Sequence, residues 1–341
     1  KRSFFQNMAW TTKSGALNAF RLSDAEYWRL FNRFFSSSSS KTTTYKFALL
    51  KAILDNLFNN ESVANGERIL YSDIFSKFAE SFWNLVVKYR LRQKAVTSDG
   101  KTTKIEQIFH EYVRKEPILG CIEFAAIEER TRIALIRKVQ QECCRYVLGA
   151  LYGDFSGNLY GFDLLGDSLV LAPGAYEFLL KYKIEVEKLN YYYWAQFLER
   201  INDESVLFGI LGKLELSLPQ REPLSVFRKV LSIEFEENNC FYCGCKLSGI
   251  VHVDHFIPWS FVKEDKLWNF VLSCPKCNIK KSNILPEKRL IEKINFRNER
   301  ILAHSGEFIN AQFKGYTKNL VENLWHYALF AGFRVMGEDP R

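Results

Sequence analysis

The sequence lacks several features that would define its class at once. Among its 341 residues, no apolar run reaches the roughly 18–20 residues that a membrane-spanning helix needs. The first residues do not form the charged, apolar and small-residue pattern of a signal sequence. There is no P-loop and no internal repeat. We therefore expect a cytoplasmic protein with no membrane partner.

What remains is an ordinary globular composition with a moderate positive charge. Hydrophobic residues make up 47% of the chain and charged residues 25%, and the length is enough for two domains. The net charge of +8 is compatible with a polyanionic partner but is a weak indication alone. Residues 276–300 hold eight basic and three acidic residues, and residues 88–104 hold six and one. Such runs are usually solvated helix faces.

Residues 20–235 have the patterns of a mainly helical region. Ser23 and Glu26 form a capping-box signal, and helices are predicted at 27–35, 45–58, 74–86, 103–115, 123–150 and 175–202. The turn-rich segment 153–174 predicts one short hairpin. Aromatic residues at 191–194 could stack on nucleobases, but their helical spacing favours a place in the core.

The pattern changes near residue 235. Short β-prone stretches occur around 240–246 and 250–254, and helical periodicity returns at 316–333. The predicted fold class is therefore mainly α, with a helical recognition or regulatory domain at 1–230, a small ββα domain at 231–295 and a C-terminal helical extension at 296–341.

Eight cysteines could suggest a disulfide scaffold, but their spacing indicates a metal site. Cys240 and Cys243 form one C-x2-C pair, and Cys274 and Cys277 form a second. Two such pairs let four sulfurs approach one Zn²⁺ tetrahedrally at about 2.3 Å. Such a site has no open position, so we expect the zinc to be structural. Cys245 is interpreted as a spare thiol, and three further cysteines in apolar helical sequence as buried small hydrophobes: Cys121, Cys143 and Cys144.

The residues between the two cysteine pairs carry groups suited to phosphodiester hydrolysis. His255 follows Asp254 after a short β-prone stretch, Asn269 comes 14 residues later, and Asn278 stands directly behind Cys277. Hydrolysis needs a base to activate water, for which a neutral imidazole is suited. It also needs oxygen ligands for a hard cation, and a group that holds the base in one tautomer.

This segment resembles the His-Asn-His, or ββα-metal, nuclease family. The spacing of its motif residues is similar, with no gap, to that in the nuclease domain of CRISPR RNA-guided effector nucleases. The resemblance covers about 45 residues. It implies His255 as the general base, with Asn269 orienting it. Asp254 and Asn278 would bind catalytic Mg²⁺ or Mn²⁺, and Lys281, with Lys280 beside it, would bind substrate phosphate.

Two other interpretations stay open. The chain could be a non-catalytic, zinc-stapled DNA-binding or adaptor protein, which would show salt-sensitive DNA binding and indifference to His255. It could also be the same nuclease acting on RNA. For the nuclease we expect double-stranded DNA as the substrate. By analogy, we expect a prokaryotic restriction or anti-phage effector. Its helical domain, a regulatory protein partner or a homodimer would restrain the nuclease.

Overall fold

The computed structural model describes residues 13–18, 20–36, 39–96, 100–216, 224–235, 237–304 and 306–337. It is mainly helical, as the sequence predicted. Two compact units emerge, one of residues 1–179 and 183–219, which we call the helical unit, and one of residues 180–182 and 220–341, which we call the zinc-knuckle unit. None of the helices in the described ranges combines the length and the apolar character needed to cross a bilayer.

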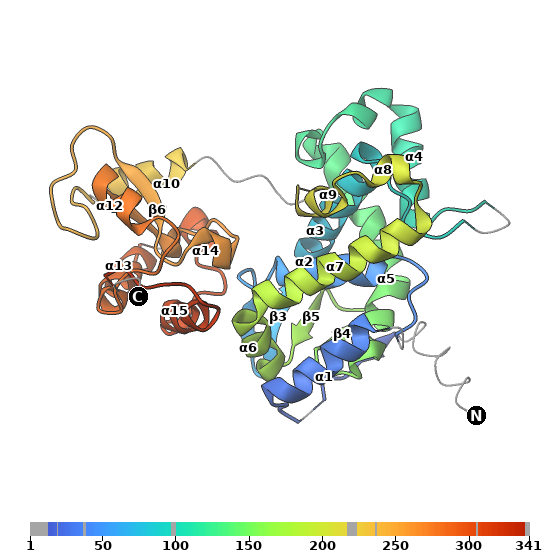
Figure 1. Cartoon of the computed structure of the whole chain (residues 1–341), viewed down its shortest axis with the longest axis horizontal. Coiled ribbons are helices and arrows are strands. Elements are labelled where there is room, and N and C mark those ends of the chain that lie inside the picture. The colour runs from blue at the N-terminus through green and yellow to red at the C-terminus, as the bar shows by residue number, and fades with distance from the viewer. Residues whose placement is uncertain are drawn as a thin grey trace. The chain divides into compact units, whose positions relative to one another are not determined.

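The helical unit is built mainly from helices of different lengths, joined by turns, by longer segments and by short strands (Figure 1). Its helices are α1 (Asp24–Phe35), α2 (Tyr45–Leu54), α3 (Tyr71–Trp83), the π-helical turn η2 (Asn84–Lys88), α4 (Lys104–Lys115), the 3-10 turns η3 (Pro117–Cys121) and η4 (Phe124–Ala126), α5 (Glu129–Phe155), α6 (Pro173–Lys181), α7 (Lys183–Ile201), α8 (Glu204–Leu207) and α9 (Ile210–Leu216).

Helix α1 begins where the sequence predicted it. The Ser23 hydroxyl accepts a hydrogen bond from the backbone N–H of Glu26, whose carboxylate accepts one from the Ser23 N–H. Thr103 and Glu106 form the same reciprocal arrangement at the start of α4. Both pairs satisfy backbone donors that the first turn of a helix leaves free.

The helical unit also contains a five-stranded antiparallel sheet with the order β1–β4–β5–β3–β2. Its strands are β1 (Ser14–Gly15), β2 (Glu61–Val63), β3 (Gly66–Leu70), β4 (Tyr160–Asp163) and β5 (Ser168–Leu171). The hairpin β4–β5 confirms the hairpin predicted in segment 153–174. Strands β1, β2 and β3 were not predicted, because they are very short and the sheet is completed by distant pairing: β1 pairs with β4 and β3 with β5, while β2 pairs with β3.

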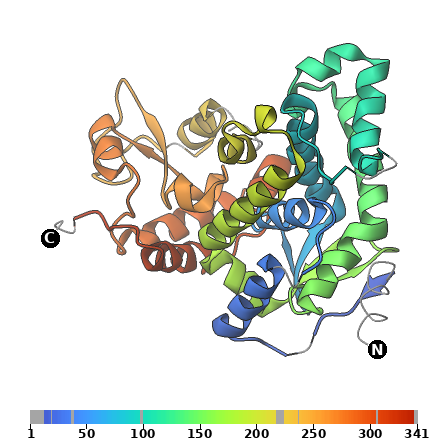
Figure 2. The same ribbon diagram turned by 45° about the vertical axis from the view of Figure 1, so that its right-hand side comes forward.

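The core of the helical unit surrounds α2, in which nine of the ten residues are buried. Helix α2 packs against α3, α5 and α7, and the 27-residue helix α5 runs along the length of this unit (Figure 2). Tyr191 and Trp194 on α7 are buried, which confirms their predicted place in the core, whereas Tyr192 is 51% exposed. Of the cysteines predicted to be buried, Cys143 is buried, but Cys121 is exposed at the end of η3.

The zinc-knuckle unit consists of short elements. They are α10 (Ser225–Lys229), the π-helical turn η5 (Val230–Glu234), β6 (His252–His255), α11 (Trp259–Val262), the 3-10 turn η6 (Leu267–Asn269), β7 (Phe270–Ser273), α12 (Pro275–Lys281), α13 (Leu290–Leu302), α14 (Glu307–Gln312) and α15 (Leu320–Phe330). Strands β6 and β7 pair antiparallel, with His252 opposite Ser273 and His255 opposite Phe270.

The β-prone stretch 240–246 does not form a strand. It is a turn closed by an isolated bridge between Asn239 and Lys246, because its cysteines converge on a cluster instead of extending. The partner of β6 is therefore β7, which lies 15 residues downstream. The loop between these strands carries α11 and η6.

The C-terminal helices pack onto the segment that carries the cysteines. Helix α13 contacts α14 and α15, and α14 contacts η6. The Trp325 indole donates a hydrogen bond to the Pro286 carbonyl at 2.9 Å, and Leu285 donates to the Arg334 carbonyl at 2.8 Å. Residues 231–295 and 296–341 thus lie in one compact unit. The separate roles predicted for them stay predictions.

Candidate functional site

Four cysteine sulfurs converge at one point of the zinc-knuckle unit. The Sγ atoms of the two predicted C-x2-C pairs, Cys240 with Cys243 and Cys274 with Cys277, all lie within 4.8 Å of one another. Four sulfurs at about 2.3 Å around a tetrahedral zinc would stand about 3.8 Å apart. The measured 3.9 Å between Cys243 and Cys274 matches that spacing. The cluster therefore fits a structural zinc ion.

Local backbone geometry forms both halves of this cluster. Gly244 adopts a φ of +74°, a left-handed conformation that favours glycine, and its N–H donates to the Cys240 carbonyl. The second half begins at Cys274, the N-cap of α12, and Pro275 follows at the first helical position, where a missing N–H costs nothing. Each pair thus forms a tight turn that aims two sulfurs at one point.

Backbone hydrogen bonds prepare part of the cluster for metal binding. The backbone N–H of Cys245 lowers the pKa of the Cys243 thiol, and the N–H of Cys277 does the same for Cys274. Burial raises the pKa of Cys277. The Cys245 sulfur lies 3.4 Å from that of Cys243, and this contact raises the Cys245 pKa to about 12. A bound cation would stabilise the thiolates.

Tyr242 connects the cysteine cluster to Asp254. Tyr242 stands inside the first C-x2-C pair, and its hydroxyl donates a hydrogen bond of 2.6 Å to Asp254 Oδ2. The ammonium of Lys281, from α12 behind the second pair, lies 3.5 Å from the same oxygen. Tyr242, inside the first cysteine pair, and Lys281, behind the second, therefore both hold the Asp254 carboxylate in place.

Lys281 is fully buried beside this carboxylate. Burial lowers its pKa, an effect that the charge of Asp254 opposes. A buried ammonium costs free energy unless it is paired, and Asp254 supplies the pairing. The neighbouring Lys280 is exposed. Of the two lysines predicted to bind phosphate, Lys280 is the one whose side chain reaches solvent.

His255, the last residue of β6, is held by a residue that the sequence did not single out. Its Nε2 lies 2.8 Å from Oδ1 of Asp265, in the loop between α11 and η6. Its ring packs against Phe270, with 4.5 Å between centroids. The His255 and Asp265 side chains are only 11% and 8% exposed. The imidazole is thus fixed by one carboxylate and one aromatic ring.

Asn269 is completely buried and bonds to the backbone of Ile257 rather than to the imidazole. Its Oδ1 accepts from the Ile257 N–H at 2.8 Å, and its Nδ2 donates to the Ile257 carbonyl at 2.9 Å. The Asn269 carbonyl also accepts from the N–H of Phe256, directly after His255. Asn269 therefore fixes the backbone that follows β6. If Asn269 orients His255, as the sequence predicted, it would do so through this backbone.

Asn278 lies on α12 three residues before Lys281, so the two side chains leave the helix on one side. Helix α12 packs against β6, and Lys281 reaches Asp254 from it. Within the described residues, neither the Asn278 amide nor Asp254 Oδ1 has a hydrogen-bond partner. Carboxylate and amide oxygens are ligands suited to Mg²⁺, so the donors present fit the expected cation.

The basic run 276–300 divides into buried and exposed side chains. Arg297 is buried and pairs with Glu237 at 3.5 Å. Lys293 lies 4.4 Å from the ring centroid of Phe241. The exposed members, which could meet a polyanion, are Lys276, Lys280, Lys288, Arg289, Lys293 and Arg300. The run is therefore partly structural and partly a solvated basic surface.

One comparison with known proteins agrees with this geometry, and it concerns one segment of the chain. A family model described as HNH endonuclease matches residues 240–287, which confirms the resemblance inferred from the sequence. The matched segment contains the cysteine cluster, His255, Asp265 and α12. Searches among curated proteins and among solved structures found no match. The match indicates a nuclease-type domain and extends over that segment alone.

Sequence reasoning missed Tyr242 and Asp265. Tyr242 stands between two predicted ligands, and Asp265 lies in the polar loop that follows Pro258. A carboxylate ten residues after His255 has no sequence signal that separates it from an ordinary loop residue, because the fold of that loop decides whether it returns to the imidazole. Tyr242 could have been suspected from its place beside the ligands.

Proposed function

We propose that this chain is a metal-dependent endonuclease that hydrolyses DNA phosphodiester bonds with His255 as the general base. The observation that carries the proposal is the hydrogen bond from His255 to Asp265, in a segment that matches the HNH endonuclease family and beside a paired Asp254. An imidazole held by a carboxylate is a recurring arrangement for taking a proton from a nucleophile.

In this proposal Asp265 selects the tautomer of His255. Because a carboxylate only accepts hydrogen bonds, the imidazole donates through Nε2–H and keeps Nδ1 as an acceptor. Nδ1 then takes the proton of the attacking water. Phe270 packs against the ring and limits its rotation. Asp265 is therefore a positioning residue, and His255 is the group that moves the proton.

Asp254 and Asn278 would hold Mg²⁺ or Mn²⁺. A bound cation of this kind would stabilise charge on the phosphate and on the leaving oxygen. Tyr242 and Lys281 orient the Asp254 carboxylate from the two sides of the cysteine cluster. Lys281 also offsets the negative charge of that carboxylate. The zinc would thus act on the reaction only by fixing the residues that carry Tyr242 and α12.

Substrate binding would fall to the exposed basic residues of 276–300, with Lys280 closest in sequence to Asn278. Lysine and arginine side chains on such a surface contact phosphates without reading sequence. Double-stranded DNA is the proposed substrate. RNA is the second candidate, and comparing both substrates under identical ionic conditions decides between them.

The test is cleavage of supercoiled plasmid with Mg²⁺ or Mn²⁺. We expect His255→Ala to lower the cleavage rate by roughly 10²- to 10⁴-fold, because general base catalysis contributes that much. His326→Ala is the matched control, since His326 lies on the surface of α15 in the same unit. Zinc content and unfolding temperature should be unchanged in both variants.

Cleavage by His255→Ala at the wild-type rate would reject the assignment. If the wild type binds DNA with a strong salt dependence but never cleaves it, the zinc-stapled DNA-binding or adaptor function is correct instead. Loss of activity on chelation of Mg²⁺ at unchanged zinc content separates the two metals.

For the biological context we propose a prokaryotic restriction or anti-phage effector whose helical unit restrains the nuclease. The reason is that an unrestrained nuclease would damage the genome of its own cell. Restraint could involve a partner protein or a second copy of the chain. Rapid cleavage of any DNA by the purified, monomeric chain would contradict this part of the proposal without affecting the nuclease assignment.

A further inference from the structure

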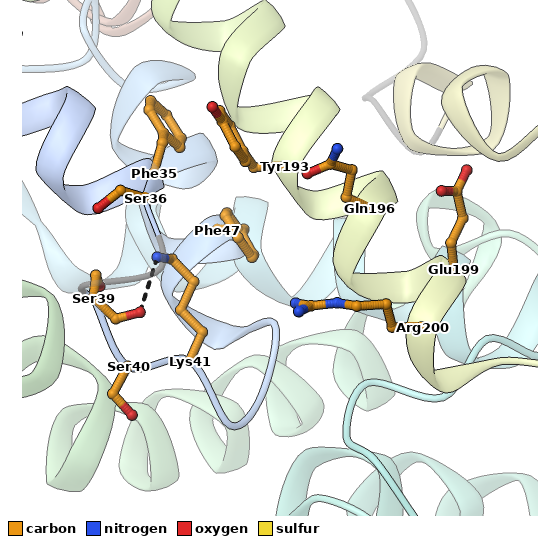
Figure 3. Close-up of a pocket in the computed structure, with 10 residues that line it drawn as sticks. All are labelled: Phe35, Ser36, Ser39, Ser40, Lys41, Phe47, Tyr193, Gln196, Glu199 and Arg200. Atoms are coloured by element: carbon orange, nitrogen blue, oxygen red, sulfur yellow. Dashed lines mark hydrogen bonds between the residues drawn. The ribbon is translucent and has the colours of Figure 1, made fainter.

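The helical unit contains a polar pocket that the nuclease site does not use. It has a volume of about 670 Å³ and is formed by the end of α1, the loop before α2 and one side of α7. A pocket of this size accommodates a small molecule. Figure 3 shows the side chains that line it, and all of them belong to the helical unit.

Two cations face this pocket from different walls. Lys41 comes from the loop between α1 and α2, and Arg200 from the last turn of α7. In Figure 3 the guanidinium of Arg200 extends toward the ammonium of Lys41. Glu199 also lines the pocket, so these charged groups give a net charge of +1, two cations minus one carboxylate.

Arg200 has no carboxylate partner among the described residues. Its guanidinium carbon lies 5.3 Å from the ring centroid of Phe197, and its side chain is exposed. Asp154, whose charge acts on Lys41, is already engaged, since it binds Lys46 at 2.8 Å and the Ser39 hydroxyl at 2.9 Å. The positive charge of Arg200 is therefore available to a ligand.

Lys41 is held in place but is not neutralised by a direct ion pair within the described residues. Its ammonium donates to the backbone carbonyls of Phe34 and Ser39, and it lies 4.7 Å from the ring centroid of Phe34. Burial, together with the positive charges of Lys46 and Arg200, lowers the pKa of Lys41 to about 8. The negative charge of Asp154 opposes this shift. An anion in the pocket would relieve the crowding of positive charge.

The remaining walls offer hydrogen-bond donors and an aromatic ring. Ser40 supplies a hydroxyl and Gln196 an amide, whereas the Ser39 hydroxyl donates to Asp154. Tyr193 is stacked on Phe35 with 5.1 Å between ring centroids and an interplanar angle of 11°, so its ring is held in a fixed orientation. Two cations, the neutral donors of Ser40 and Gln196 and a fixed ring suit a ligand that has a charged oxygen-rich group and an organic body.

We propose that this pocket binds a small phosphorylated molecule, with Lys41 and Arg200 contacting its phosphate. A phosphate group carries up to two negative charges and several acceptor oxygens, which match the two cations, the Ser40 hydroxyl and the Gln196 amide. Binding at this place would give the helical unit a function of its own. The proposal does not depend on the nuclease activity.

The test is calorimetric titration of the full, zinc-loaded chain without added Mg²⁺ or DNA. The probes are inorganic phosphate, adenosine 5′-monophosphate and adenosine, at constant ionic strength. We expect the two phosphate-bearing probes to bind and adenosine not to bind. Arg200→Gln should weaken binding of both about tenfold or more, because a charge-assisted contact is lost. Lys41→Gln should have the same effect.

Arg137→Gln is the matched control, since Arg137 is exposed on α5 and does not line the pocket. It should bind the probes like the wild type. Because Arg200 is also exposed, its substitution should leave the unfolding temperature unchanged. The proposal is overturned if neither phosphate-bearing probe binds, if adenosine binds equally well, or if Arg200→Gln binds like the wild type. The same titration with His255→Ala should be unaltered.

Discussion

Different interactions stabilise the fold of each of the two units of this chain. The helical unit has helices of up to 27 residues around a core of large apolar side chains, among them Trp83 and Trp194. The segment of the zinc-knuckle unit that matches the family model contains two strands of four residues and a helix of seven. A two-stranded sheet is marginally stable by itself, so this segment needs the cysteine cluster. Apolar burial holds the first unit, and we expect metal ligation at the cysteine cluster to hold the segment around β6 and β7 in the second.

Removal of zinc is the strongest way to test this comparison. Loss of the ion, or Cys274→Ser, should unfold the segment around β6 and β7, because structural zinc contributes about 10 kcal/mol or more to small domains. The helical unit should stay folded. Hydrogen exchange followed by mass spectrometry should show protection lost in residues 240–287 and kept in α2, α5 and α7.

Cys245→Ser is the matched control for that variant, since Cys245 lies beside the cluster but outside its four sulfurs. It should keep zinc and protection. Equal loss of protection in both units after chelation would show that the zinc site supports the whole chain, and the comparison would then be wrong.

The core of the helical unit provides the converse test. Trp194 is fully buried and stacks on Phe47, with 6.3 Å between ring centroids. Trp194→Ala should lower the free energy of unfolding by about 3–5 kcal/mol, because it leaves a large cavity. Zinc content and plasmid cleavage should not change. Calorimetry should show only the transition of the helical unit moving to lower temperature.

Tyr192→Ala, on the same helix but 51% exposed, is the control and should cost less than about 1 kcal/mol. Should Trp194→Ala also abolish zinc binding, the two units would not be energetically separate.

Asp265→Asn has the smallest expected free-energy change. The amide can donate to Nε2 and so favour the tautomer that carries its proton on Nδ1, which cannot accept a proton from water. We expect cleavage to slow by about 100-fold, within the range that general base catalysis contributes. Nitrogen NMR of the His255 ring should report the change of tautomer.

Glu287→Gln breaks only an exposed pair with Arg289 and should cleave at the wild-type rate. A normal rate for Asp265→Asn together with an altered ring tautomer would exclude Asp265 as the positioning residue. A change in unfolding temperature would instead indicate a structural role.

How much the sequence could predict differs between elements. Helices α1 and α4 were predictable because a capping box at α1 and apolar spacing in both are local signals. The single helix predicted at 175–202 is divided into α6 and α7. The convergence of the four cysteine sulfurs was predictable because C-x2-C spacing limits how two sulfurs can point. Strands β1, β2 and β3 were missed, since β1 and β3 depend on pairing with distant β4 and β5, and β2 is a three-residue edge strand on β3.

The sequence alone determined which chemical groups this protein has and the spacing that makes His255, Asp254 and four cysteines belong together. Only the tertiary structure decided that Asp265 binds the imidazole, that Asn269 fastens Ile257 and that Lys281 is buried against Asp254. The physical reason is that each contact joins residues from different elements or loops, and whether those residues meet depends on how the elements pack and how the loops between them run.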